Sequence, residues 1–178
     1  MGRYVAMLRG VNVGGKQIKM PALAALFSDL GYTDVVTYIQ SGNVVFTSPS
    51  RGGDTLARAI EARIARDLGM DVRVLLRSRA ELERVQRGNP LLRAGADPTK
   101  LHVTFLATKP AAALVGAVKE LDFGADTFAV AGREVYVHCP NGYGRTKINN
   151  TFFEKKLDVA ATTRNWNTVN KLLELASA

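Results

Sequence analysis

Residues 35–46, VVTYIQSGNVVF, contain two short apolar runs on either side of a polar turn. Short runs rich in Val, Tyr and Phe are typical of strands, and residues 40–43, QSGN, are typical of a tight turn. The stretch therefore predicts an antiparallel hairpin with strands at Val35–Ile39 and Val44–Phe46. The segments on either side of this hairpin indicate how it is built into a sheet.

Helical spacing of apolar residues appears on both sides of the hairpin, over residues 21–30 and 54–68, with Asp54 as the expected N-cap of the second helix. Tyr4–Leu8 and Val72–Leu76 are expected to be the first and fourth strands along the chain. The order βαββαβ predicts a ferredoxin-like arrangement, in which the first and third strands are central. We expect Tyr4–Leu8 to lie centrally, and Val72–Leu76, which alternates with arginines, to be a half-exposed edge strand.

The pattern partly recurs in the second half of the chain. We expect a strand over 101–107, a helix over 111–121 and a hairpin over 127–137. Two helices are expected in place of a fourth strand: one begins with a capping box at Thr151, and the other begins at Thr163. The predicted fold is α+β: a ferredoxin-like βαββαβ unit over 1–78, a helix and linker over 79–99, and a second, smaller βαββ unit with two C-terminal helices over 100–178.

Composition describes an ordinary globular protein. Apolar residues make up 47% and charged residues 22% of the 178, which excludes a disordered chain. No apolar run reaches the 18 residues of a membrane span, so no membrane partner is expected. A single cysteine, Cys139, and the lack of a signal peptide predict a cytoplasmic protein.

The net charge of +8 is confined to two segments. Residues 1–20 and 141–171 each carry a net charge of +4, whereas the rest of the chain has 14 basic and 14 acidic residues. Clustered positive charge attracts anions, so we interpret these segments as a binding surface rather than as solubilising charge alone.

Each charged segment contains a basic glycine-rich loop. Residues 10–16, GVNVGGK, resemble the start of a P-loop, but Gln17 stands where a magnesium-binding hydroxyl is needed, so a nucleotide hydrolase is rejected. The loop can still hold an anion on its backbone N–H groups, or it can be a plain connection. Residues 141–147, NGYGRTK, lead into the helix expected at Thr151, whose N-terminus favours an anion; the alternative is a solvated turn.

No catalytic set stands out, and no metal ligand or cofactor is predicted. Cys139 is interpreted as an apolar residue at a strand end, His102 as a paired core histidine and Trp166 as a core anchor that leaves its polar neighbours free. The predicted anion-binding residues are Arg9, Asn12, Gly14, Gly15, Lys16, Gln40, Ser41, Asn43, Tyr143, Arg145, Lys147, Arg164 and Asn165.

Three longer motifs carry a resemblance to a known family. They are LRGVNVGGK at 8–16, YIQSGNVVF at 38–46 and ATTRNWNT at 161–168. With them the chain resembles the bacterial family catalogued as domain of unknown function 1697. The resemblance implies a compact α/β fold of about this length, and no activity or residue role to transfer.

Three functions remain open from the sequence. The first is binding of a phosphate-bearing ligand, either a small molecule or nucleic acid. The second is an enzyme that acts on a small phosphorylated or carboxylated metabolite held by Arg145, Lys147 and Arg164. The third is a structural or assembly module without chemistry.

Overall fold

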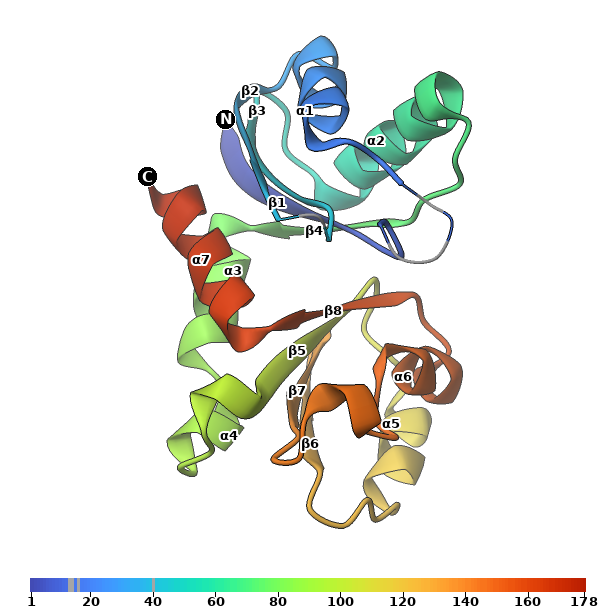
Figure 1. The fold of residues 1–178 in the computed structure, drawn as a ribbon, viewed down its shortest axis with the longest axis vertical. Helices are drawn as coiled ribbons and strands as arrows, with labels where there is room; N and C mark the ends of the chain where they lie inside the picture. The colour runs from blue at the N-terminus through green and yellow to red at the C-terminus, as the bar shows by residue number, and fades with distance from the viewer. Residues whose placement is uncertain (13–14, 16, 40) are drawn as a thin grey trace. The chain divides into compact units, whose positions relative to one another are not determined.

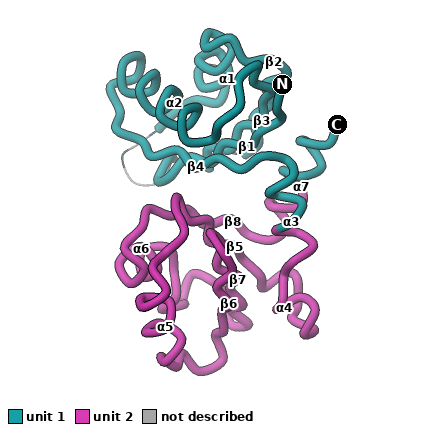
Figure 2. The backbone as a smooth tube through the Cα atoms, turned by 180° about the vertical axis from the view of Figure 1, so that it is seen from behind, with its two compact units in different colours: residues 1–84, 171–178 teal, residues 85–170 magenta. Residues whose placement is uncertain are grey.

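The computed structural model describes residues 1–12, 15, 17–39 and 41–178. The protein is α+β with two four-stranded antiparallel sheets, which confirms the predicted class at that level (Figure 1). One compact unit comprises residues 1–84 together with 171–178, and the other comprises residues 85–170 (Figure 2). Among the described residues, no helix is long and apolar enough to cross a membrane.

The first sheet has the strand order β2-β3-β1-β4. The predicted central pair is confirmed, since Tyr4 lies opposite Phe46, and β4 lies at the edge as predicted. The N-cap of the second helix is Gly52, so the prediction of Asp54 is wrong; Asp54 lies inside the first turn. The elements are β1 (Gly2–Leu8), α1 (Met20–Asp29), β2 (Thr33–Tyr38), β3 (Asn43–Ser48), α2 (Gly53–Leu68), β4 (Val74–Ser78) and α3 (Arg79–Arg87).

Both faces of the first sheet are buried along β1, β3 and β4. On one face, Tyr4, Ala6 and Leu8 pack with the apolar stripes of α1 and α2. On the other face, Leu75 and Arg77 are only 2% and 1% exposed. The expectation of a half-exposed β4 is therefore wrong, because alternation along a strand shows that its faces differ and not that one is solvated.

The second sheet has the order β6-β7-β5-β8. The prediction that its fourth strand is missing is wrong, since β8 pairs with residues 102–106 of β5. Thr163 lies inside β8, and Asn165 caps the last helix by accepting a hydrogen bond from the Thr168 N–H at 2.8 Å. The elements are α4 (Pro90–Arg93), η1 (Pro98–Lys100), β5 (Leu101–Leu106), α5 (Ala112–Lys119), β6 (Thr127–Ala131), β7 (Glu134–His138), η2 (Tyr143–Arg145), α6 (Asn150–Leu157), β8 (Ala161–Asn165) and α7 (Trp166–Ser177).

The two units repeat one connectivity and one strand register. Val5 lies between Val45 and Arg77 in the first sheet, as Val103 lies between Tyr136 and Arg164 in the second. Each residue of one sheet core therefore has a counterpart in the other, although the two sequences show no residue-level repeat.

The units differ in two loops. Residues 9–19 connect β1 to α1, whereas the counterpart connection in the second unit is only 107–111. Conversely, residues 49–52 connect β3 to α2, whereas the counterpart is 139–149. Each predicted basic loop is thus an extension that one unit has and the other lacks.

Candidate functional site

A polar network lies on the helix-covered face of the second sheet. The Thr104 and Thr163 hydroxyl oxygens are 2.8 Å apart, and the Thr163 hydroxyl donates to Asn150 Oδ1 at 2.9 Å. The Asn150 backbone N–H donates to the Tyr143 hydroxyl, and its side-chain amide donates to the Ala161 carbonyl, each at 2.9 Å. The network therefore ties β5, β8 and the start of α6 to the 139–149 loop.

His102 and Tyr143 stack at one side of this network. Their ring centroids are 4.3 Å apart and their planes differ by 22°. Burial lowers the pKa of His102, and burial is also the main reason that the pKa of Tyr143 is raised. Within the described residues, the buried Nδ1 of His102 has no hydrogen-bond partner, so the expectation of a paired histidine is wrong for this atom.

The first unit shows that the sheet does not require this network. The counterparts of Thr104 and Thr163 are Ala6 and Leu76, and both belong to an apolar core. A sheet with the same strand register thus folds with apolar side chains at these positions. Burying polar groups there costs free energy unless every one of them is hydrogen-bonded. We infer that the network serves the 139–149 loop. Sequence reasoning missed Thr104, Asn150 and Thr163, because only the alignment of the two sheets reveals them.

The lowered pKa of His102 predicts a pH effect on stability. The unfolded chain takes up the proton near the ordinary pKa of about 6.5, before the folded chain does, so stability should fall as pH drops below that value. Melting temperatures from pH 7.5 to 5 should decline less in His102→Phe than in the parent, and His138→Gln is the control. Equal declines in parent and His102→Phe would contradict the prediction.

The 141–147 loop presents its charges outward. Thr146 is buried and donates to Asp126 at 2.7 Å, whereas Arg145 and Lys147 on either side are exposed. In the described part of the chain, neither cation has an ion-pair partner. Buried Thr146 therefore anchors a loop whose two cations face solvent.

Asn149 caps α6 at the end of this loop. Its side chain accepts from the Phe152 N–H at 2.9 Å, so the predicted capping box at Thr151 is wrong. Glu154, the expected partner of that box, instead accepts from the Ala161 N–H. The backbone N–H groups of Asn150 and Phe152 already donate to Tyr143 and Asn149, so they are not open to an anion. Any anion binding by the loop therefore depends mainly on its two cations.

The site residues predicted in the first unit have mostly local partners. Gly14, Lys16 and Gln40 lie outside the described residues. The Asn12 side chain accepts from the Ile18 N–H at 2.9 Å and donates to the Ile18 carbonyl, which closes the loop on itself. Gly15 is exposed and Arg9 is half-buried.

Gly42 of the first hairpin lies beside the start of this loop, because the Leu8 N–H donates to the Gly42 carbonyl at 2.9 Å. Asn43 is buried and donates to the Tyr38 carbonyl and to the Ser41 hydroxyl. Asn43, which was predicted to bind the anion, therefore does not lie at the surface; it holds the hairpin turn from inside.

Arg164 is buried rather than available at the surface. Only 7% of it is exposed, and its guanidinium donates to the Thr162 hydroxyl at 2.6 Å and to the Thr163 carbonyl. Burial lowers its pKa to about 10, so it is charged at neutral pH. Alternate residues of β8 face opposite ways, so Thr163 faces the network and Arg164 does not. Asn165 is exposed, but its side chain caps α7.

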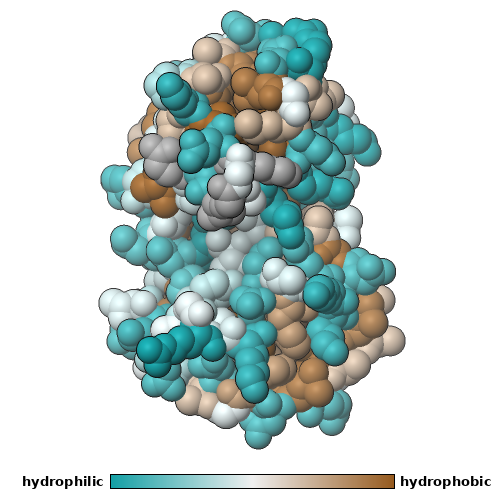
Figure 3. Space-filling view, turned by 45° about the vertical axis from the view of Figure 1, so that its right-hand side comes forward, coloured by the Kyte–Doolittle hydropathy of each residue, from teal (hydrophilic) through white to brown (hydrophobic). Residues whose placement is uncertain are grey.

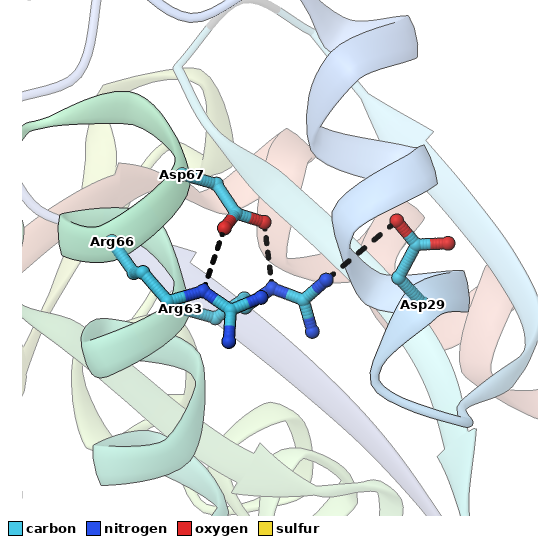
Figure 4. Close-up of polar contacts among 4 residues, drawn as sticks. All are labelled: Asp29, Arg63, Arg66 and Asp67. Atoms are coloured by element: carbon cyan, nitrogen blue, oxygen red, sulfur yellow. Dashed lines mark hydrogen bonds and ion pairs between the residues drawn. The ribbon is translucent and has the colours of Figure 1, made fainter.

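Several arginines in the middle of the chain, where basic and acidic residues balance, have acidic partners. Arg63 lies between Asp67, at 2.6 Å, and Asp29, at 3.8 Å, and Arg66 contacts Asp67 at 3.0 Å (Figure 4). Hydrogen bonds from Arg63 and then Arg66 lower the pKa of Asp67. These cations are therefore matched by acids, unlike Arg145 and Lys147.

The described residues offer little for metal or cysteine chemistry. No three His, Cys, Asp or Glu side chains gather among them as a metal site requires. Cys139 is buried, as predicted, and burial raises the pKa of its thiol, which disfavours the thiolate.

Comparisons with known proteins agree with this picture of the fold. The sequence profile of the family described as "Protein of unknown function (DUF1697)" matches residues 1–136. The solved structure of the conserved bacterial protein SP0830 from Streptococcus pneumoniae is similar, with a TM-score of 0.77, 22% identity and 98% of each chain covered. The search of curated proteins found no match.

Proposed function

Because the chain belongs to the DUF1697 family, whose description assigns no activity, we propose a function from its own residues: it binds a phosphate-bearing anion at the 141–147 loop. The observation that carries this proposal is that two unmatched cations lie two residues apart on one anchored loop. Arg63, Arg66 and Arg73 have acidic partners, whereas Arg145 and Lys147 are exposed without one in the described residues. Unmatched cations on one loop concentrate anions there.

The loop is suited to this task because its base is held in place. Arg145 offers a planar fork that matches two phosphate oxygens, and Lys147 offers a compact charge. Tyr143 and Thr146 bond to the body of the unit, so the loop loses little freedom when a ligand binds. The glycines at 142 and 144 leave the backbone open to close approach.

We also propose that both units are variants of the ferredoxin-like arrangement. The order of elements, βαββαβ, and the shared strand order support this classification. On that classification the basic loop is an insertion after the third strand of the second unit.

An enzyme acting on a small phosphorylated or carboxylated metabolite is the second candidate. The observation that favours it is that the His102 Nδ1 has no hydrogen-bond partner among the described residues and that its ring stacks on Tyr143 of the 141–147 loop. A neutral imidazole can accept a proton from a bound ligand. Turnover of such a metabolite that is lost in His102→Phe, with binding retained, would favour the enzyme.

Removing either loop cation should weaken anion binding. We expect Arg145→Gln and Lys147→Gln each to raise the Kd for pyrophosphate or a single-stranded oligonucleotide at least fivefold, because each loses a direct charge contact. Arg66→Gln is the matched control, since it removes the same charge from a paired site. Thermal shift provides the measurement, because a ligand at 100 times its Kd stabilises by about 2.7 kcal/mol.

The salt dependence of binding separates the two ligand classes. For an oligonucleotide, each lost phosphate contact should flatten the slope of log K against log salt by about 1. Tight pyrophosphate binding with no oligonucleotide binding would indicate a small molecule. If Arg66→Gln weakens binding as much as Arg145→Gln, net charge alone is responsible and the loop is not the site.

A further inference from the structure

A pocket of about 360 Å³ lies on the second unit between α5 and the β6–β7 hairpin. Pro110, Val115, Gly116 and Val130 line it, together with Lys109 and Lys119. This volume falls within the range of small-molecule sites. In Figure 3, which brings the side of the molecule that carries α5 forward, apolar surface bordered by hydrophilic side chains is visible in the lower part of the view. The pocket shares no residue with the 141–147 loop.

The first unit closes the counterpart position with its own side chains. Val11 and Ile18 of the long 9–19 loop are 2% and 3% exposed and belong to the core of that unit. Val11 packs against the hairpin turn, since a Cβ built on Gly42 would lie 3.4 Å from the Val11 Cβ. Two aliphatic side chains therefore cover this end of the first core.

The second unit has no such cover, because its connection is only residues 107–111. Lys109 is the third residue after β5 and is exposed, whereas Val11, the third residue after β1, is buried. Within the described residues, neither Lys109 nor Lys119 has an ion-pair partner. The pocket thus combines aliphatic walls with two unmatched ammonium groups.

We propose that this pocket binds a small amphipathic carboxylate, namely an aliphatic acid of about six to eight carbons. Its hydrocarbon chain takes the place that Val11 and Ile18 fill in the first unit, and packs on Pro110, Val115 and Val130. Its carboxylate lies beside Lys109 and Lys119, at the mixed apolar and cationic edge. The proposal is independent of phosphate binding at the 141–147 loop.

Gly116 provides a direct test, because a Cβ built there meets no atom within 4 Å beyond its chain neighbours and the backbone of its own helix. Gly116→Leu should fill the pocket without a clash, and Gly116→Ala is the matched control that adds one methyl group. By calorimetry with the whole protein, octanoate should bind the parent and Gly116→Ala, with a Kd at least tenfold higher for Gly116→Leu. Circular dichroism and melting temperature check that each variant is folded.

The charge requirement has its own comparison. Octanol should bind at least tenfold more weakly than octanoate, and Lys109→Gln with Lys119→Gln should reduce octanoate binding at least fivefold without changing octanol binding. Absence of octanoate binding, or equal binding by the Gly116→Leu and Gly116→Ala variants, would overturn the site. Equal affinity for octanoate and octanol would overturn the assignment of a carboxylate.

Discussion

Replacing Trp166 with alanine should lower the free energy of unfolding by about 3–5 kcal/mol, as truncation of a large buried aromatic side chain does. Trp166 is the first residue of α7 and is 5% exposed, and Val169 and Leu172 of the same helix are fully buried. Deletion of the indole should leave a cavity at the junction of β8 and α7. Its place as a buried residue on the stripe of the last helix confirms the sequence prediction.

Chemical denaturation followed by circular dichroism measures this loss. Trp166 is the single tryptophan, so intrinsic tryptophan fluorescence cannot follow the variant. Trp166→Phe should lose less stability than Trp166→Ala, because most of the ring volume remains. A midpoint that is unchanged in Trp166→Ala would show that the indole is not part of the core.

Arg164→Ala should destabilise the protein by about 3 kcal/mol, far beyond the ~0.5 kcal/mol usual for a surface substitution. The variant loses the hydrogen bond from the guanidinium to Thr162 and leaves a buried void. Arg66→Ala is the control, since its side chain is 71% exposed.

Arg164→Lys distinguishes charge from shape. It keeps the positive charge but loses the planar fork, so it should recover only part of the stability lost in Arg164→Ala. The measurement is again chemical denaturation. Equal stability of Arg164→Ala and the parent would contradict a structural role for the buried guanidinium.

The fold of the first unit could be predicted because its strands are apolar enough to be recognised alone. β8 could not, because its sequence, ATTRN, has few apolar residues. Its core-facing Thr163 is accommodated only by hydroxyl and amide partners 59 and 13 residues away in the chain. A strand stabilised in this way lacks the alternation of apolar and polar residues by which a strand is recognised in a sequence.

For the candidate site, too, some features could be predicted from the sequence and others could not. The exposure of the Arg145 and Lys147 charges could be expected, since unmatched charge is visible in the sequence. The burial of Asn43 and Arg164 could not, because the face on which a strand residue lies depends on register, and a shift of one residue reverses it. The role of Asn149 as a cap likewise depends on where α6 begins.

Because the end of the last helix belongs to the first unit, that unit is completed only at the end of synthesis. Residues 171–178 belong to the first unit, where Arg3 donates to the Leu175 carbonyl and Arg79 to the Ser177 hydroxyl. A ribosome produces these residues only after the whole of the second unit. The first unit is therefore incomplete, without its final helical turns, until the second unit has been translated. Nascent chains that stall before residue 171 should be more sensitive to protease in residues 1–84 than the finished protein.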